Sequence, residues 1–322
     1  MNILITGVAG FIGFHTAMRY LAQGENVIGI DSLNDYYDVS LKEARLSKLS
    51  DYDKFEFFKL DINNKESLDK IFHASQPGYV IHLAAQAGVG YSIKNPYAYI
   101  EANINGFMNI LEASRNEFTK HLVFASSSSV YGANTKLPFS VNDNVDHPLS
   151  LYAATKKSNE LMAHVYSHLY DIPTTGLRFF TVYGPWGRPD MAAYIFTKNL
   201  FEKKTFDLFN FGRMERDFTF VEDIVNGIIP LVKFKKRKKD LHKIYNLGNN
   251  KPEPLMKLVN LLEKFSGKKA KIKKKGMQLG DVRHTYANIQ DSKKDLQFRP
   301  QTNLEEGLEK FVNWYKEYHK VN

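Results

Sequence analysis

Three glycines near the start of the chain restrict its fold more than any other feature. The apolar run of residues 1–6 is typical of a buried parallel strand, and Gly7, Gly10 and Gly13 follow it, before an amphipathic stretch over residues 15–23. Such glycines permit a tight turn, close approach of the backbone to a pyrophosphate, and close packing of helix on strand, with the positive helix end at the phosphates. The spacing is G-x-x-G-x-x-G rather than G-x-G-x-x-G. A turn that serves packing alone is the alternative.

An acidic residue follows the second expected strand. Residues 26–30 form a second apolar run that ends at Asp31, about where an acid binds the adenosine ribose hydroxyls in a dinucleotide-binding unit. A carboxylate at this place repels a 2′-phosphate. The sequence therefore predicts NAD, rather than NADP, as the cofactor.

Tyr152 and Lys156, spaced as Tyr-x-x-x-Lys, are the candidate catalytic pair. A phenol has an ordinary pKa of about 10, so it is a poor base at neutral pH unless a nearby cation favours the phenolate. Residues four apart share a helix face, so we expect the Lys156 ammonium beside the Tyr152 ring. The chain has 18 tyrosines, and a solvated helix pair is the alternative. With the hydroxyls of the serine run 126–129, the pair indicates hydride chemistry at a sugar carbinol.

The order of strand and helix patterns predicts an α/β fold with a doubly wound parallel sheet, the Rossmann arrangement. Strands are expected at residues 2–6, 26–30, 55–59, 79–83, 121–125 and 174–178, with helices at 40–48, 64–75, 95–116 and 152–170 between them. Beyond residue 180 the pattern loosens, with helices expected near 190–203, 221–234, 254–265 and 303–319. We therefore predict a Rossmann domain over residues 1–180 and a smaller mixed α/β substrate domain over residues 181–322, interwoven with the first.

The composition is that of a soluble enzyme. A chain of 322 residues, 43% hydrophobic and 25% charged, can bury one large core or two joined cores. No apolar run approaches the ~20 residues that span a bilayer, so no membrane partner is expected. The first strand leaves no room for a secretory signal, and we expect a cytoplasmic protein. The absence of cysteine excludes disulfides and thiolate catalysis, and no His/Asp/Glu spacing indicates a metal site.

The net charge of +9 comes largely from lysine runs at residues 233–243 and 268–275. Neither run interleaves aromatic residues and arginines as a base-stacking surface does, so no nucleic-acid partner is predicted. We expect the first run to be an exposed loop after a helix and the second to be a short strand with solvated flanks. The positive field would also attract an anionic substrate.

With these elements in order, the chain resembles the extended short-chain dehydrogenase/reductase family, specifically nucleotide-sugar epimerases of the UDP-glucuronate 4-epimerase type. The resemblance covers nearly the whole length. It is carried by TGVAGFIGFH (6–15), GIDSLNDYYDVSLKEARL (29–46), HLAAQAGV (82–89), FASSSSVYG (124–132), YAATK (152–156), LRFFTVYGPWGRPDMA (177–192) and RDFTFVEDI (216–224). It implies NAD as cofactor, a UDP-sugar as substrate, and a homodimer formed through the helices at 95–116 and 151–170.

The resemblance also implies a larger cofactor site. Asp61 and Ile62 match an acid and a backbone amide placed against adenine, with a helix N-terminal acid as the alternative for Asp61. Asn103 resembles an asparagine that holds neighbouring backbone near the active site, with a solvated helix residue as the alternative. The predicted cofactor-binding residues are Gly7, Gly10, Phe11, Ile12, Gly13, Asp31, Asn34, Asp61, Ile62, Leu83, Ala84, Ala85, Gln86, Asn103, Tyr152 and Lys156.

For the reaction, the resemblance implies that Tyr152, as a phenolate, takes the proton of the sugar 4-hydroxyl while the C4 hydride passes to NAD. Ser127 matches the family's catalytic Ser/Thr register, and a serine that only caps the backbone is the alternative. Related dehydratases carry an Asp-Glu pair after this residue and decarboxylases a glutamate, whereas this chain has Ser128 and Ser129. Without a local carboxyl group, the 4-keto sugar is expected to be returned rather than consumed.

The resemblance predicts six substrate-binding residues, which are Ser127, Ser128, Thr181, Arg188, Phe209 and Arg216. Arg216 resembles an arginine that binds the nucleotide diphosphate, and Phe209 one that packs on uracil. Thr181 lies where UDP-galactose epimerases place an asparagine. Arg188 matches the glucuronate epimerase motif and would hold the sugar C6 carboxylate, with a loop arginine paired with Asp190 as the alternative.

Two positions depart from the family pattern. Gly90 stands where the family commonly has an arginine, for which Lys94 is a candidate substitute, and Leu279 stands in place of a proline. Three hypotheses follow. The first is a UDP-glucuronate 4-epimerase, the second a 4-epimerase of a neutral or N-acetylated UDP-hexose, and the third a non-catalytic NAD-binding or basic scaffold protein.

Overall fold

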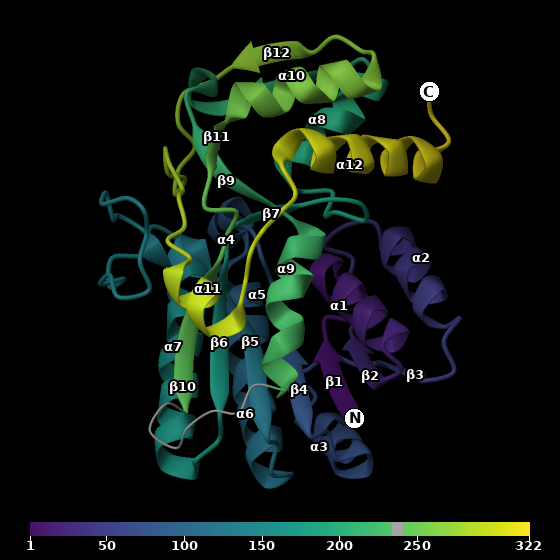
Figure 1. Cartoon of the computed structure of the whole chain (residues 1–322), viewed down its shortest axis with the longest axis vertical. Coiled ribbons are helices and arrows are strands. Elements are labelled where there is room, and N and C mark those ends of the chain that lie inside the picture. The colour runs from purple at the N-terminus through teal and green to yellow at the C-terminus, as the bar shows by residue number, and fades with distance from the viewer. Residues whose placement is uncertain (234–240) are drawn as a thin grey trace.

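A seven-stranded parallel sheet forms the centre of the molecule (Figure 1). The structure is a computed structural model that describes residues 1–233 and 241–322. In the spatial order β10-β6-β5-β4-β1-β2-β3, the strands are His242–Leu247, Thr174–Phe179, His121–Ser127, Tyr79–His82, Asn2–Thr6, Asn26–Asp31 and Phe55–Lys59. Almost every residue of β1, β5 and β6 is buried, because helices cover both faces of the sheet. The predicted doubly wound α/β sheet is confirmed.

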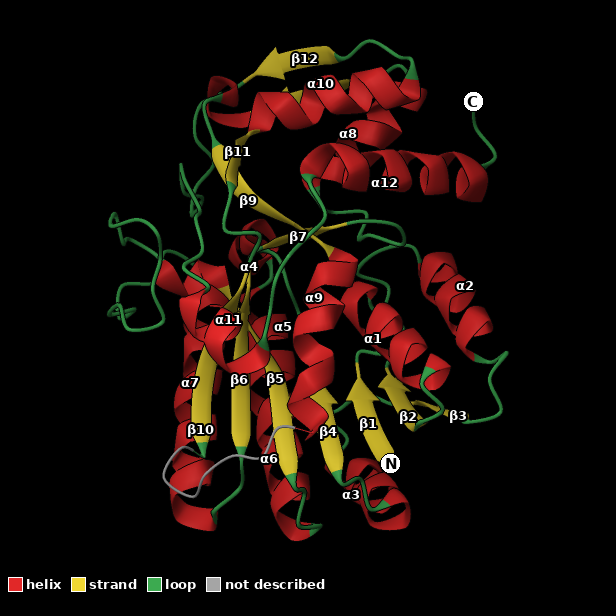
Figure 2. Ribbon diagram, viewed as in Figure 1, coloured by secondary structure: helices red, strands yellow, loops and turns green. Residues whose placement is uncertain are grey.

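Two layers of helices enclose this sheet (Figure 2). One face carries α1 (Phe11–Ala22), α2 (Val39–Leu49), α9 (Val221–Ile228) and α11 (Gln290–Leu296). The other face carries α3 (Lys65–Ser75), α6 (Gly106–Asn116) and α7 (Leu151–Tyr170). Since the strands are parallel, all their carboxyl ends lie at one edge of the sheet, and the C-terminal part of the chain lies above that edge.

The C-terminal part contains two small sheets and three helices. One sheet has the order β11-β9-β7, with strands Pro252–Pro254, Glu215–Phe220 and Thr181–Tyr183, and the other pairs β12 (Lys271–Lys274) with β8 (Thr205–Leu208). The helices α8 (Ala192–Phe201), α10 (Leu255–Ser266) and α12 (Leu304–His319) pack against them. β10 lies beyond residue 181, where the second domain is predicted to begin, yet it pairs with β6 in the large sheet.

The expected single helix over residues 95–116 is divided into three parts. It consists of α5 (Pro96–Tyr99), a π-helical segment over Ile100–Asn105, and α6, with the short helix α4 (Val89–Lys94) before it. The wider turn of a π-helix changes the direction of the side chains within it. Asn103 consequently points inward, where its side chain reaches the backbone of Gln86. Gly106 begins α6 directly after this segment, and a Cβ there would lie 2.5 Å from the Ile62 side chain.

The predictions for the two lysine runs can be compared with the structure to different extents. Residues 271–274 form the expected short strand, with three of its four side chains exposed. Most of the run at 233–243 lies outside the described residues, although Lys243 in β10 forms an ion pair with Asp295. Among the described parts of the chain, no helix is sufficiently long and apolar to cross a membrane.

Candidate active site

A cavity of about 1150 Å³ lies between the carboxyl edge of the large sheet and the C-terminal part. Its wall includes every predicted cofactor, catalytic and substrate residue except Asn103. Asn103 acts from behind the wall: its side chain accepts from the Gln86 amide at 2.8 Å and donates to the Gln86 carbonyl at 3.0 Å. The same side chain donates to Thr155 of α7, so Asn103 fixes the wall against the helix of Tyr152.

The glycine turn has no room for a Cβ atom at Gly7 or Gly13, as the motif predicts. Gly7 has a φ of +70°, and a Cβ at this residue would lie 2.7 Å from the Ala84 nitrogen at the end of β4. A Cβ at Gly13 would lie 2.1 Å from the Gly7 carbonyl oxygen. This closeness brings the N-terminus of α1 to the cavity, where its free N–H groups and dipole suit a diphosphate. The donors present therefore fit the pyrophosphate of NAD.

Asp31 lies beside this turn at the end of β2. Its carboxylate accepts from the backbone N–H of Ala9 at 3.1 Å and of Leu33 at 2.9 Å. Burial raises the pKa of Asp31, and these hydrogen bonds with the nearby Lys42 ammonium oppose the rise. Asn34, three residues later, is held by Lys42, which donates to its side-chain and backbone oxygens. The acid and the amide thus stand where the sequence places the adenosine ribose.

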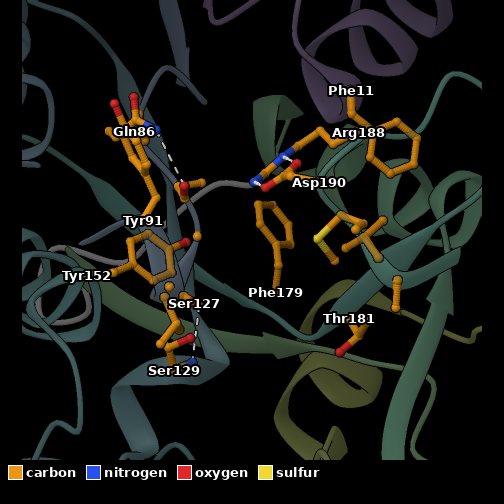
Figure 3. Close-up of a pocket in the computed structure, with 18 of the residues that line it drawn as sticks. Phe11, Gln86, Tyr91, Ser127, Ser129, Tyr152, Phe179, Thr181, Arg188 and Asp190 are labelled. Carbon is orange, nitrogen blue, oxygen red and sulfur yellow. Dashed lines mark hydrogen bonds and ion pairs between the residues drawn. The ribbon is translucent and has the colours of Figure 1, made fainter. Parts of the chain in front are cut away.

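Tyr152 and Ser127 face one another on one side of the cavity (Figure 3). Burial raises the pKa of the Tyr152 phenol, the Ser127 side chain and the Arg188 charge lower it, and the Asp190 charge raises it. Ser127 also accepts from the Ser129 amide at 3.1 Å, which orients its oxygen. Ser126 points elsewhere, since its hydroxyl donates to the buried Glu160 at 2.6 Å.

Lys156 is almost completely buried, which its spacing from Tyr152 does not predict. Its ammonium is 2% exposed and donates to the Ala125 carbonyl at 2.9 Å, and burial lowers its pKa to about 7. The Arg188 charge lowers the pKa of the Tyr152 phenol, and the charge of its partner Asp190 raises it. The role of Lys156 beside the phenol remains a prediction from the helix spacing.

Arg188 lies across the cavity from Ser127 and forms an ion pair with Asp190 (Figure 3). The pairing that the sequence leaves as the alternative for Arg188 is therefore present. Tyr36, from the loop after β2, donates its hydroxyl to the same carboxylate at 3.2 Å. Desolvation and the Asp190 charge raise the pKa of Tyr36 to about 12, so this phenol remains a donor.

The outer part of the cavity is formed by the C-terminal sheets. Arg216 on β9 donates to Asp281 at 2.7 Å and to the Arg283 carbonyl at 3.0 Å. Thr181 and Phe209 line the same region. Motif reasoning missed Asp281 and Tyr36, because these contacts join segments 65 and 154 residues apart and no local pattern marks them. Among the described residues, no cluster of His, Asp or Glu could hold a metal ion.

The fold and cavity define a dinucleotide-dependent enzyme, and the chain belongs to the NAD dependent epimerase/dehydratase family, whose model matches residues 3–248. NAD, the cofactor expected from Asp31, is the one that this family uses.

Within this family, the chain is similar to two proteins by sequence and to one crystal structure by fold. The chain is 54% identical to Protein CapI of Staphylococcus aureus, over 99% of this chain and 100% of the relative. It is 45% identical to UDP-glucuronate 4-epimerase 2 of Arabidopsis thaliana, over 99% of this chain and 77% of the relative. The crystal structure of UDP-glucuronic acid 4-epimerase from Bacillus cereus, in complex with UDP-glucuronic acid and NAD, superposes with a TM-score of 0.93 at 33% identity, covering 99% and 100% of the two chains.

The half-buried His15 and the buried His82 make stability depend on pH. Burial lowers the pKa of His15 to about 4 and that of His82 to about 3. A histidine in the unfolded chain titrates near ~6.5, so below that pH the unfolded chain binds protons that the folded protein does not. The contribution of both histidines to stability is therefore present above pH ~6.5 and lost as the pH falls. The raised pKa values of Asp31 and Asp217, the latter about 6, act in the opposite direction.

We predict that His15→Gln makes the free energy of unfolding less dependent on pH between 6.5 and 4, because glutamine does not titrate. Urea unfolding of the wild type and the variant at several pH values measures this difference. The two aspartates contribute equally to both proteins and cancel in the comparison. Identical slopes for the two proteins would contradict the assignment of His15 as a neutral residue of the folded state.

Proposed function

We propose that this protein is an NAD-dependent UDP-glucuronate 4-epimerase, acting in the cytoplasm to interconvert UDP-glucuronate and UDP-galacturonate. One observation carries the proposal. Tyr152 and Ser127 lie on one side of the cavity and Arg188 on the other, with the glycine turn of α1 and Asp31 in the same wall. A hydroxyl pair suited to a carbinol and a guanidinium suited to a carboxylate thus face one substrate-sized space.

The chemistry at C4 needs a base that returns the same proton. Tyr152, as the phenolate, takes the proton of the sugar 4-hydroxyl and later gives it back to the oxygen at C4. Ser127, which faces that phenol, donates to the sugar oxygen as negative charge develops on it. When bound, NAD supplies the acceptor and the donor of the C4 hydride. If the planar ketone presents its other face before the hydride returns, the configuration at C4 is inverted.

The residues after Ser127 favour epimerisation over further reaction. Ser128 and Ser129 line the cavity beside it, and neither has a carboxyl group with which to remove the proton at C5. The phenol of Tyr99, which meets the Tyr152 ring edge at 6.0 Å, is committed as a donor to the carbonyls of Ala87 and Gly88. The two positions after Ser127, where related dehydratases carry an Asp-Glu pair, therefore offer no carboxyl base for elimination.

Substrate binding is assigned to the outer cavity. Arg216 is proposed to bind the diphosphate, exchanging part of its bond with Asp281, and Phe209 to cover the uracil ring. Arg188 is proposed to contact the C6 carboxylate. One observation favours the second hypothesis, a 4-epimerase of a neutral or N-acetylated UDP-hexose: Asp190 already neutralises Arg188.

A homodimer is part of the proposal. Exposed apolar side chains recur along α7 at Leu161, Val165 and Leu169, four residues apart and hence on one face. Met108 of the neighbouring α6 is also exposed and contacts Tyr166 of α7. A stripe of this kind on adjacent helices suits the same stripe of a second copy, forming a four-helix bundle about a two-fold axis.

Tyr152→Phe is expected to reduce the turnover of UDP-glucuronate by about 10² to 10⁴-fold, because it removes the proton acceptor. The measurement is the ratio of UDP-glucuronate to UDP-galacturonate by NMR over time. Tyr170→Phe, on the same helix but far from the cavity, serves as the matched control and should retain wild-type turnover. Undiminished turnover by Tyr152→Phe would remove the mechanism.

Arg188→Ala is expected to lower kcat/KM for UDP-glucuronate by about 10 to 100-fold, the effect of losing one charged hydrogen bond. The loss for UDP-glucose should be smaller, since it reflects only the loss of the Arg188 charge that lowers the pKa of Tyr152. Asp190→Asn is the control, since it keeps the cation but removes its partner, and should improve the use of UDP-glucuronate. Equal losses for both sugars, or unchanged use of UDP-glucuronate by Arg188→Ala, would favour the neutral-sugar epimerase.

Leu161→Glu is expected to convert a dimer into a monomer, because it buries a charge in the proposed apolar interface. Light scattering after gel filtration measures the mass directly. Phe211→Glu changes an equally exposed apolar residue of the C-terminal part and should leave the mass unchanged. A monomeric wild-type protein, or a dimeric Leu161→Glu variant, would refute this interface.

A further inference from the structure

Side chains of α1 and α2 form hydrogen bonds to the backbone of residues 185–187, directly before Arg188. Three consecutive carbonyl groups, those of Pro185, Trp186 and Gly187, accept hydrogen bonds from this direction. His15 of α1 bonds Pro185 at 2.9 Å, and Arg45 of α2 bonds Trp186 at 2.6 Å and Gly187 at 3.4 Å. We call residues 184–191, which end in the pair of Arg188 and Asp190, the sugar-facing loop.

Arg45 contacts the cofactor site with its other terminal nitrogen. This nitrogen donates to the Ala9 carbonyl in the glycine turn at 2.7 Å and to the Tyr37 hydroxyl in the loop after β2 at 2.8 Å. The side chain is 0% exposed, and none of the described residues forms an ion pair with it. Neutral oxygens of three separate segments accept from both terminal nitrogens of this guanidinium, whereas its buried Nε has no hydrogen-bond partner. One rigid side chain therefore joins the glycine turn, the ribose loop and the sugar-facing loop.

The sugar-facing loop has a backbone that needs such support. Gly184 has a φ of +145° and Trp186 a φ of +62°, a left-handed conformation that is costly for a tryptophan. Ring packing against Phe14 and Trp314 adds to the hydrogen bonds that hold Trp186 there. The far end of the loop is also attached to the cofactor side, because Tyr36 donates to Asp190.

His15 is suited to this role as a neutral donor. Burial lowers its pKa to about 4, and the nearby Arg45 and Arg19 charges act in the same direction. Its ring is held edge-on by Phe11 and Phe14, at 5.7 and 5.1 Å between centroids. The imidazole therefore offers its Nε2–H to Pro185 in a fixed direction at neutral pH.

We propose that Arg45 and His15 are positioning residues, which place Arg188 at the substrate by tying the sugar-facing loop to the cofactor-binding turn. This inference rests on the proposed function, in that Arg188 is taken to contact the C6 carboxylate. The selectivity for a uronate over a neutral sugar then depends on two residues that do not line the cavity. The sugar is bound by a loop that hydrogen bonds hold in place from the cofactor-binding part of the protein.

The test measures binding rather than turnover, so that it is separate from the test of the reaction. Calorimetry on the NAD-loaded protein gives the Kd values of UDP-glucuronate and UDP-glucose for the wild type, His15→Phe and His15→Gln. His15→Phe keeps an aromatic ring between Phe11 and Phe14 but loses the donor. It is expected to weaken UDP-glucuronate binding about tenfold, the equivalent of one hydrogen bond, with little effect on UDP-glucose.

Two further comparisons separate positioning from a general loss of structure. His15→Gln retains an N–H donor and should restore most of the uronate affinity. In an Arg188→Ala background, His15→Phe should have no further effect, since residues that act through one another are not additive. Arg19→Met, one turn later on α1 and bonded to Asn226 rather than to the loop, is the control and should not change either Kd.

Arg45→Lys extends the test to the second residue. Lysine keeps the charge but presents one nitrogen, which cannot serve the glycine turn and the sugar-facing loop together. We expect weaker binding of UDP-glucuronate together with faster loss of NAD on dialysis. The proposal is overturned if the wild type does not prefer the uronate, if His15→Phe weakens both sugars equally, or if its effect persists without Arg188. Uronate-selective binding that follows the expected pattern, without epimerisation, would instead refute only the proposed reaction.

Discussion

The contact between the glycine turn and the ends of β1 and β4 is the constraint from which the rest of the site follows. There is no room for a Cβ at Gly7 or Gly13, so α1 begins directly against the carboxyl edge of the sheet. Its positive end is thereby centred in the cavity, and His15, four residues after Phe11, meets the chain at Pro185. A larger residue in the turn would displace the phosphate site and the sugar-facing loop together.

The features of the fold and of the site that could be predicted from the sequence are those that depend on residues close together in the chain. The alternation of apolar strands and helices predicted the large sheet, and the glycine spacing with Asp31 predicted NAD as the cofactor, because each is a local pattern of neighbouring residues. Contacts between distant segments were not predictable in this way. Tyr36 with Asp190, Arg45 with Trp186, and the inward turn of Asn103 at a π-helical segment all depend on tertiary packing. The roles proposed for Tyr152, Ser127 and Arg188 still await their tests.

Desolvation dominates the electrostatics of the cavity. Burial raises the pKa of Tyr152 and lowers that of Lys156 to about 7, so each group is moved toward its neutral form. The helix spacing places the two residues on one face of α7, but it could not show that Lys156 is buried and bonded to the Ala125 carbonyl at the end of β5. The charge of Arg188 lowers the pKa of the phenol, and that of its partner Asp190 raises it. In the proposed function, the Arg188 guanidinium therefore affects both the base and the binding of the sugar.

The position of β10 bears on how this protein could be divided or built. The strand is made by residues 242–247, yet it completes the large sheet beside β6, and its Asn246 bonds the Tyr131 hydroxyl and the Phe139 carbonyl. A gene fragment stopping at the apparent end of the Rossmann half would expose the N–H and C=O groups of β6 as an unprotected border, open to pairing with other chains. The two lobes are consequently poor candidates for separate expression or for exchange between homologous enzymes, and any chimera would need to carry β10 with the first lobe.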